Sequence, residues 1–140
     1  ANSVLIWDGI ETSVQSTADI GGTRIELTNA TTVTATRVTA AANTYTIHFH
    51  VIEYWPGVIR RVQRGTIAIV GASSGTATIT AVNTAKTSIT YLGLSTTDVT
   101  LTGAAPLFGR LALTNATTLT LTIVAVALTS TGSYEAVEFY

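Results

Sequence analysis

One stretch of this chain occurs twice, and this repetition limits the possible folds more than any other feature of the sequence. Residues 27–32 are identical to residues 113–118, and the similarity extends outward from both copies. Each copy then leads to a similar ending, at residues 49–54 in the first and 134–139 in the second. A repeat of this length indicates that one structural unit is used twice.

Each copy has the pattern of a β-hairpin. The sequence Asn-Ala-Thr, at residues 29–31 and 115–117, lies between two segments in which Thr alternates with apolar residues. Asn and Thr side chains bond to their own backbone in turns, and alternation favours half-buried strands. Asn-Ala-Thr also matches the acceptor sequence for N-glycosylation. Its recurrence at one place in the repeat favours the turn, so we predict a turn flanked by two strands in each copy.

The composition predicts an all-β chain. Only 11% of the 140 residues are charged, against about 25% in an ordinary soluble domain. Thr and aliphatic residues take their place, and the β-branched types among them favour strands. About ten short segments with turn signals every 8–12 residues are typical of an antiparallel β-sandwich, in a jelly-roll or an Ig-like Greek-key topology.

The chain is expected to form a single domain over residues 1–140, with repeat-like halves at about 1–54 and 58–140. Trp55, Pro56 and Gly57 separate the halves, and this segment is too short and apolar to be a flexible linker. We predict that the two related units pack face to face as a pseudo-symmetric pair.

The clearest strand lies at residues 45–53, where side chains alternate between two faces. One face carries Tyr45, Ile47, Phe49 and Val51, and the other carries Thr46, His48, His50 and Ile52. A first short strand is expected at residues 4–7, ended by the turn pair Asp8-Gly9, and further strands at 76–82 and 99–101. Alternation also predicts these inward-facing side chains: Ile67, Ile69, Leu119, Leu121 and Ile123.

Charge and motif content exclude several classes of function. The formal net charge of −1 offers no electrostatic basis for binding nucleic acid. No apolar run approaches the roughly 20 residues that a membrane-spanning helix needs. The chain has no Cys, no nucleophile motif beside a base, and no phosphate-binding or calcium-binding loop. We therefore expect no catalytic residue, no cofactor and no enzymatic activity.

His48 and His50 are the only imidazoles, and they leave the same face of the strand at residues 45–53. Two such residues form half of a metal site at most, and no Cys or carboxylate follows at a suitable spacing. We predict no metal site and regard both residues as candidates for a subunit contact, because His is common in interfaces.

Two further groups are candidates for an interface. Arg60, Arg61 and Arg64 form the only basic cluster, and their planar guanidinium groups suit acidic side chains of a neighbouring subunit. Tyr54 and Trp55 are candidate anchors of an interface. The aromatic residues are also candidates for a platform on which a sugar stacks: Trp7, Tyr54, Trp55, Tyr91 and Tyr140.

Several segments resemble sequences of bacteriophage virion proteins, namely residues 27–37, 51–53, 61–67, 75–82 and 91–93. The resemblance implies a structural or accessory protein of the phage particle, of the capsid decoration or tail and fibre type. Such a protein is made in the host bacterial cytoplasm and assembles as a homo-oligomer, with a trimer favoured, on other virion proteins. The alternative is a module of a tail fibre that binds a host surface glycan or receptor.

Overall fold

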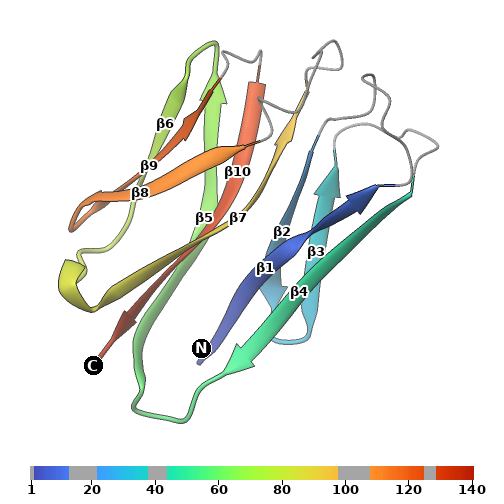
Figure 1. Ribbon diagram of the computed structural model, residues 1–140. Coiled ribbons are helices and arrows are strands. Elements are labelled where there is room, and N and C mark those ends of the chain that lie inside the picture. The colour runs from blue at the N-terminus through green and yellow to red at the C-terminus, as the bar shows by residue number, and fades with distance from the viewer. Residues whose placement is uncertain (1, 13–21, 38–43, 98–107, 125–128) are drawn as a thin grey trace.

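The computed structural model describes residues 2–12, 22–37, 44–97, 108–124 and 129–140 (Figure 1). These residues form strands and one short 3-10 helix, and the prediction of an all-β chain is confirmed. The elements are β1 (Ser3–Thr12), β2 (Thr23–Asn29), β3 (Thr32–Arg37), β4 (Tyr45–Glu53), β5 (Ile59–Val70), β6 (Ser74–Thr78), η1 (Thr84–Lys86), β7 (Thr87–Thr96), β8 (Gly109–Asn115), β9 (Thr118–Ile123) and β10 (Thr129–Phe139). No helix among the described residues is long and apolar enough to cross a membrane.

The strands form three antiparallel sheets. The largest has five strands in the order β3-β2-β7-β10-β5, a second has the order β6-β9-β8, and β1 pairs with β4. Alternation along β10 shows that the two smaller sheets cover opposite faces of the largest. Ala136 of β10 belongs to the core beneath β9, whereas the next residue, Val137, packs on Val4 of β1.

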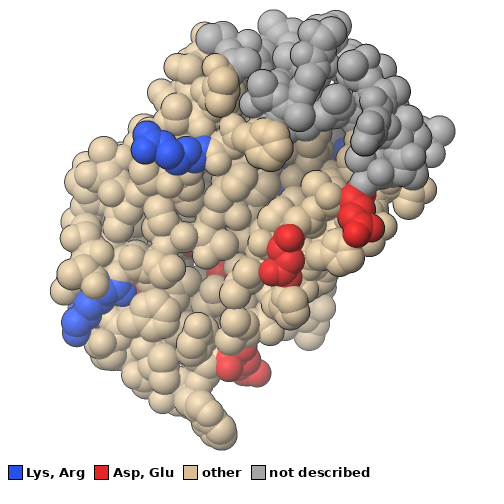
Figure 2. All heavy atoms as spheres, in the orientation of Figure 1, with Lys and Arg blue, Asp and Glu red and all other residues tan. Residues whose placement is uncertain are grey.

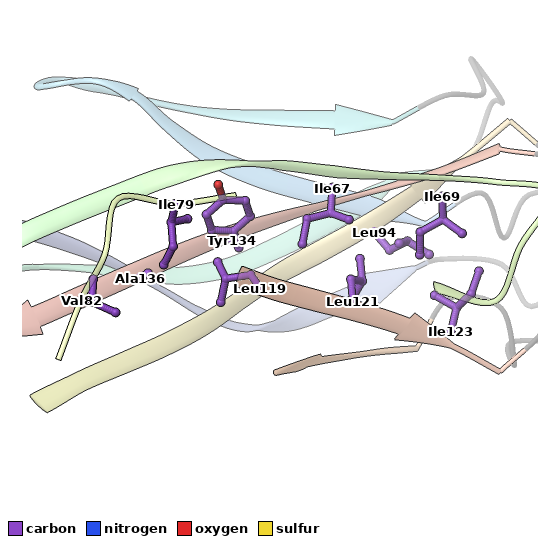
Figure 3. Close-up of a cluster of buried hydrophobic side chains, with 10 residues drawn as sticks. All are labelled: Ile67, Ile69, Ile79, Val82, Leu94, Leu119, Leu121, Ile123, Tyr134 and Ala136. Carbon is purple, nitrogen blue, oxygen red and sulfur yellow. The ribbon is translucent and has the colours of Figure 1, made fainter. Parts of the chain in front are cut away.

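The main core lies between the five-stranded sheet and the sheet β6-β9-β8 (Figure 3). Side chains at alternate positions of β9 point into it, because every second residue of a strand faces the same side. The predicted inward-facing residues Ile67, Ile69, Leu119, Leu121 and Ile123 are all buried. A second apolar cluster joins β1 to β2 and β7, and it centres on the buried residues Leu5, Ile25 and Leu92.

Both copies of the repeated sequence fold as the predicted hairpin. In the β2–β3 hairpin the Asn29 carboxamide oxygen accepts from the Thr31 N–H at 2.9 Å. In the β8–β9 hairpin Asn115 accepts from the Thr117 N–H, also at 2.9 Å. The register shifts just before Asn29 and just before Asn115. The repeat therefore encodes a local turn geometry that the fold uses twice.

The copies differ beyond the hairpins, and the prediction of two pseudo-symmetric halves is not confirmed. After the first hairpin, β4 pairs with β1 alone among the described strands. After the second, β10 lies between β5 and β7 in the centre of the largest sheet. The similar sequences that end the two copies thus occupy an edge strand and a central strand.

Three local predictions need correction or lie outside the described residues. The first strand does not end at Asp8-Gly9: β1 continues to Thr12 through a bulge, and Gly9 has a φ of 135° there. Such a conformation suits glycine and lets the strand bend without ending. The strand expected at 76–82 ends at Thr78 as β6. The strand expected at 99–101 lies outside the described residues.

Candidate functional site

Strands β1 and β4, called here the β1–β4 ribbon, are attached to the rest of the fold through a buried carboxylate. Glu135 of β10 is fully buried, and it accepts from the Leu5 N–H of β1 at 3.0 Å. Its second oxygen accepts from Arg64 Nε at 2.5 Å, and Arg64 also donates to the Ser3 carbonyl oxygen. β1 therefore directs one edge toward the five-stranded sheet, and β4 lies outermost (Figure 1).

Only Tyr45 and Ile47 of β4 are half-buried, so the strand exposes apolar side chains on both faces. Phe49 is 41% exposed and Val51 is 46% exposed on one face, and Ile52 is 38% exposed on the other. The turn after β4 continues this apolar surface with Trp55, which is 84% exposed, and Val58. We call these five residues the β4 apolar surface. The alternation of residue types at 45–53 is as predicted, but it does not mark a buried face.

The two histidines lie beside carboxylates of β1. His50 Nδ1 contacts Asp8 Oδ2, and His48 Nε2 lies 3.7 Å from Glu11 Oε1. All four side chains line one surface of the ribbon, but no group of three or more potential ligands among the described residues could hold a metal ion. The bulge at Asp8, which the sequence did not predict, is what brings this carboxylate to His50.

The three arginines of the basic cluster have separate partners within the chain. Arg60 donates to Glu138 at 3.2 Å, Arg61 donates to the Ala81 carbonyl oxygen at 3.3 Å, and Arg64 is bound to Glu135. The cluster is therefore not uniformly exposed. The Arg60 side chain is 54% exposed, whereas the Arg64 side chain is 24% exposed. A contact between these residues and a neighbouring subunit stays a prediction.

A groove of about 390 Å³ lies beside a polar cluster that the sequence analysis did not identify. Arg24 contacts Glu26 and donates to Ser133 Oγ at 3.1 Å. Ser133 in turn donates to Glu26 at 3.0 Å. Arg24 and Glu26 lie two positions apart on one strand, so the sequence places them on the same face. No neighbouring residue indicates that Ser133 joins them.

The polar side chains beside this groove bond to one another. The Ser133 hydroxyl donates to the Glu26 carboxylate, which is already paired with Arg24. Tyr134 also lines the groove, and burial raises the pKa of its hydroxyl above the ordinary value, so the group stays neutral. The imidazoles, which would suit proton transfer, lie on the β1–β4 ribbon instead.

A second concave region lies at the end of β4. It encloses about 350 Å³ and is lined by Glu53, Tyr54, Trp55 and Pro56. The Tyr54 ring packs edge-on against Phe139, with a centroid distance of 5.9 Å, so Tyr54 serves the fold. Trp55 has no such partner in the described part of the chain and presents its ring to solvent.

The chain matches no protein-family model, no curated protein and no solved structure at the level of similarity that indicates kinship. What the molecule does must therefore be argued from its own surfaces.

Proposed function

We propose that this chain is a non-enzymatic structural protein of a phage particle, which assembles on the capsid or the tail through protein–protein contacts. The observation that carries the assembly part of the proposal is the β4 apolar surface. The assignment to a phage particle rests on the sequence resemblance of segments such as residues 27–37 and 61–67. Location in the virion follows from that assignment.

The β4 apolar surface has the composition of an interface centre. Aromatic residues are enriched and charged residues depleted where protein partners exclude water. From Phe49 to Val58 the chain has one formally charged side chain, Glu53. Figure 2 shows a face with few and scattered Lys, Arg, Asp and Glu side chains. Burial of apolar area between subunits favours assembly by about 25 cal/mol for each Å², and the freedom lost on association offsets part of this gain.

A mass measurement in solution tests the assembly, and we expect a mass that is a multiple of the chain mass at micromolar concentration. Co-sedimentation with phage capsids or tails tests the partner, and electron microscopy of an intact particle locates the chain. A strict monomer that binds neither capsids nor tails would contradict the proposal. The sequence favoured a trimer, which the same mass measurement tests.

A second candidate function is binding of a host surface glycan, and the concave region at the end of β4 favours it. An exposed indole beside the carboxylate of Glu53 offers a stacking surface and a hydrogen-bond acceptor for sugar hydroxyls.

If this function is correct, Trp55→Ala is expected to abolish binding on a glycan array, because the stacking surface is lost. Phe108→Ala is a matched control, because Phe108 is also a highly exposed aromatic residue, at 68%, and lies outside this region. Equal binding by the two variants, or no glycan bound by the wild-type chain, would exclude the glycan function.

A further inference from the structure

The hydrogen bonds of β1 reveal which backbone groups of β4 point away from the fold. In an antiparallel pair, opposed residues alternate between bonded and unbonded positions. Leu5 lies opposite Val51, but the Leu5 N–H donates to Glu135. Leu5 and Val51 are therefore an unbonded pair, and the N–H and C=O of Val51 point to the side of β4 that faces away from β1. We call that side the outer edge of β4.

The same alternation extends along β4. The Tyr54 N–H donates to the Asn2 carbonyl oxygen at 2.9 Å, so Tyr54, three residues after Val51, belongs to the set bonded to β1. By the two-residue period of a strand, Phe49 directs its backbone groups to the outer edge as Val51 does. β4 has no described neighbour at this edge, and residues 48–53 are all exposed. Within the described part of the chain, a row of N–H and C=O groups of β4 is thus open to another strand.

The outer edge of β4 lacks the devices that usually keep an edge strand from pairing. Proteins protect such edges with Lys, Pro, bulges or short strands. β4 has nine residues and contains no Lys or Pro, and the bulge of the ribbon lies in β1. β5, which is also a long strand at the edge of a sheet, differs because it carries all three arginines of the basic cluster.

The sequence of β4 complements itself when two copies run antiparallel with Phe49 opposite Phe49. This register places Ile47 opposite Val51 of the second copy, so apolar side chains meet on one face and the outward backbone groups meet in bonded pairs. At each end Tyr45 lies opposite Glu53 of the second copy. The Arg37 guanidinium lies over the Tyr45 ring, 4.6 Å from its centroid, so the incoming carboxylate approaches a positive charge.

Other registers fit less well. A register with Val51 opposite Val51 would place Phe49 opposite Glu53 of the second copy, so that a bulky apolar ring would lie against a carboxylate. A register with His50 opposite His50 also lets the outward backbone groups meet in bonded pairs, but it places Ile47 opposite the carboxylate of Glu53 of the second copy. In the Phe49 register His48 lies opposite His50 of the second copy, and each imidazole already lies beside a carboxylate of β1, which limits any repulsion between them.

We propose that two copies of this chain pair antiparallel along the outer edges of β4, with Phe49 on the twofold axis. The inference deepens the proposed assembly function and rests on it, since it names a second copy as the partner of the β4 apolar surface. A twofold contact uses the same surface on both subunits, so it predicts an even number of copies rather than the trimer that the sequence favoured.

Single cysteines test the pairing, because the chain has no Cys of its own. In the Phe49→Cys variant, the Cα atoms of residue 49 in the two copies would lie about 5.5 Å apart. This separation is within the range that a disulfide spans. In Val51→Cys, the matched control, the two cysteines would lie four residues apart along the strands, or about 14 Å. We expect mild oxidation to cross-link F49C almost completely into dimers on a non-reducing gel, and V51C not at all.

A mixture of Ile47→Cys and Val51→Cys chains tests the register without changing Phe49. The mixture is expected to yield cross-linked heterodimers, whereas neither variant cross-links alone. Cross-linking of V51C alone, or failure of both F49C and the mixture, would overturn the β4 pairing.

The mass of the wild-type chain separates this inference from the proposed function. A multimer without these cross-links would overturn the β4 pairing and leave assembly intact. A mass of three chains would also overturn the twofold contact. A strict monomer would contradict both proposals.

Discussion

Replacement of Glu135 by alanine is expected to lower the free energy of unfolding by about 3–5 kcal/mol, the usual cost of removing one partner of a buried ion pair. Glu135 is fully buried and holds both the Arg64 guanidinium and the Leu5 N–H. Without the carboxylate, the Leu5 N–H has no acceptor and Arg64 keeps only its bond to the Ser3 carbonyl oxygen. The β1–β4 ribbon then loses its polar attachment to β10.

Urea denaturation at fixed protein concentration measures this effect, and Glu11→Ala is a suitable control. Glu11 is a carboxylate of the ribbon itself, but its side chain is 77% exposed and lies 3.7 Å from its imidazole partner. The control should therefore change stability by less than about 1 kcal/mol. An equal, small loss in both variants would show that Glu135 does not attach β1 to the sheet.

A double variant tests whether the loss comes from the pair. Arg64→Met alone leaves Glu135 buried without its cation and is expected to be costly. The variant that combines Arg64→Met with Glu135→Ala removes both charges, so its loss should be smaller than the sum of the single losses by about 0.5–3 kcal/mol. Strictly additive losses would mean that the two side chains act independently.

The sequence predicted those parts of the fold that depend on neighbours in the chain. The hairpin turns at Asn29 and Asn115 need only a side-chain oxygen and an N–H two residues later. The burial of Leu119 and Leu121 follows from alternation within one strand. Local chemistry of this kind is readable without knowledge of the remaining chain.

The parts that the sequence did not predict depend on distant residues. Arg64 belongs to the basic cluster of the sequence, and its carboxylate partner within the chain lies 71 positions away. Ser133 joins Arg24 from 109 positions away. The apolar face of β4 was predicted correctly as a pattern, but whether Phe49 and Val51 are buried depends on what packs over β4. No single-strand pattern contains that information.

Gly93→Ala is expected to cost about 3 kcal/mol or more, because the position is both strained and crowded. Gly93 has a φ of 89°, and a Cβ atom there would lie 2.3 Å from the Thr23 carbonyl oxygen and 3.0 Å from the Trp7 ring. The backbone oxygen cannot move aside as a flexible side chain can. Gly93 also pairs with Arg24, which is the described link between β2 and β7. The alanine should therefore push the β2–β3 hairpin away from the largest sheet.

Gly57→Ala separates the two causes of this loss. Its φ of 87° nearly equals that of Gly93, but a Cβ atom there would meet nothing within 4 Å. The control therefore includes the cost of the backbone conformation alone, about 1 kcal/mol, and the difference between the variants measures the close approach of β2 to β7. Hydrogen exchange should show faster amide exchange in β2 for Gly93→Ala only. Equal losses in the two variants would mean that β2 moves away at no cost, in which case the single backbone pair at Gly93 does not hold the two strands together.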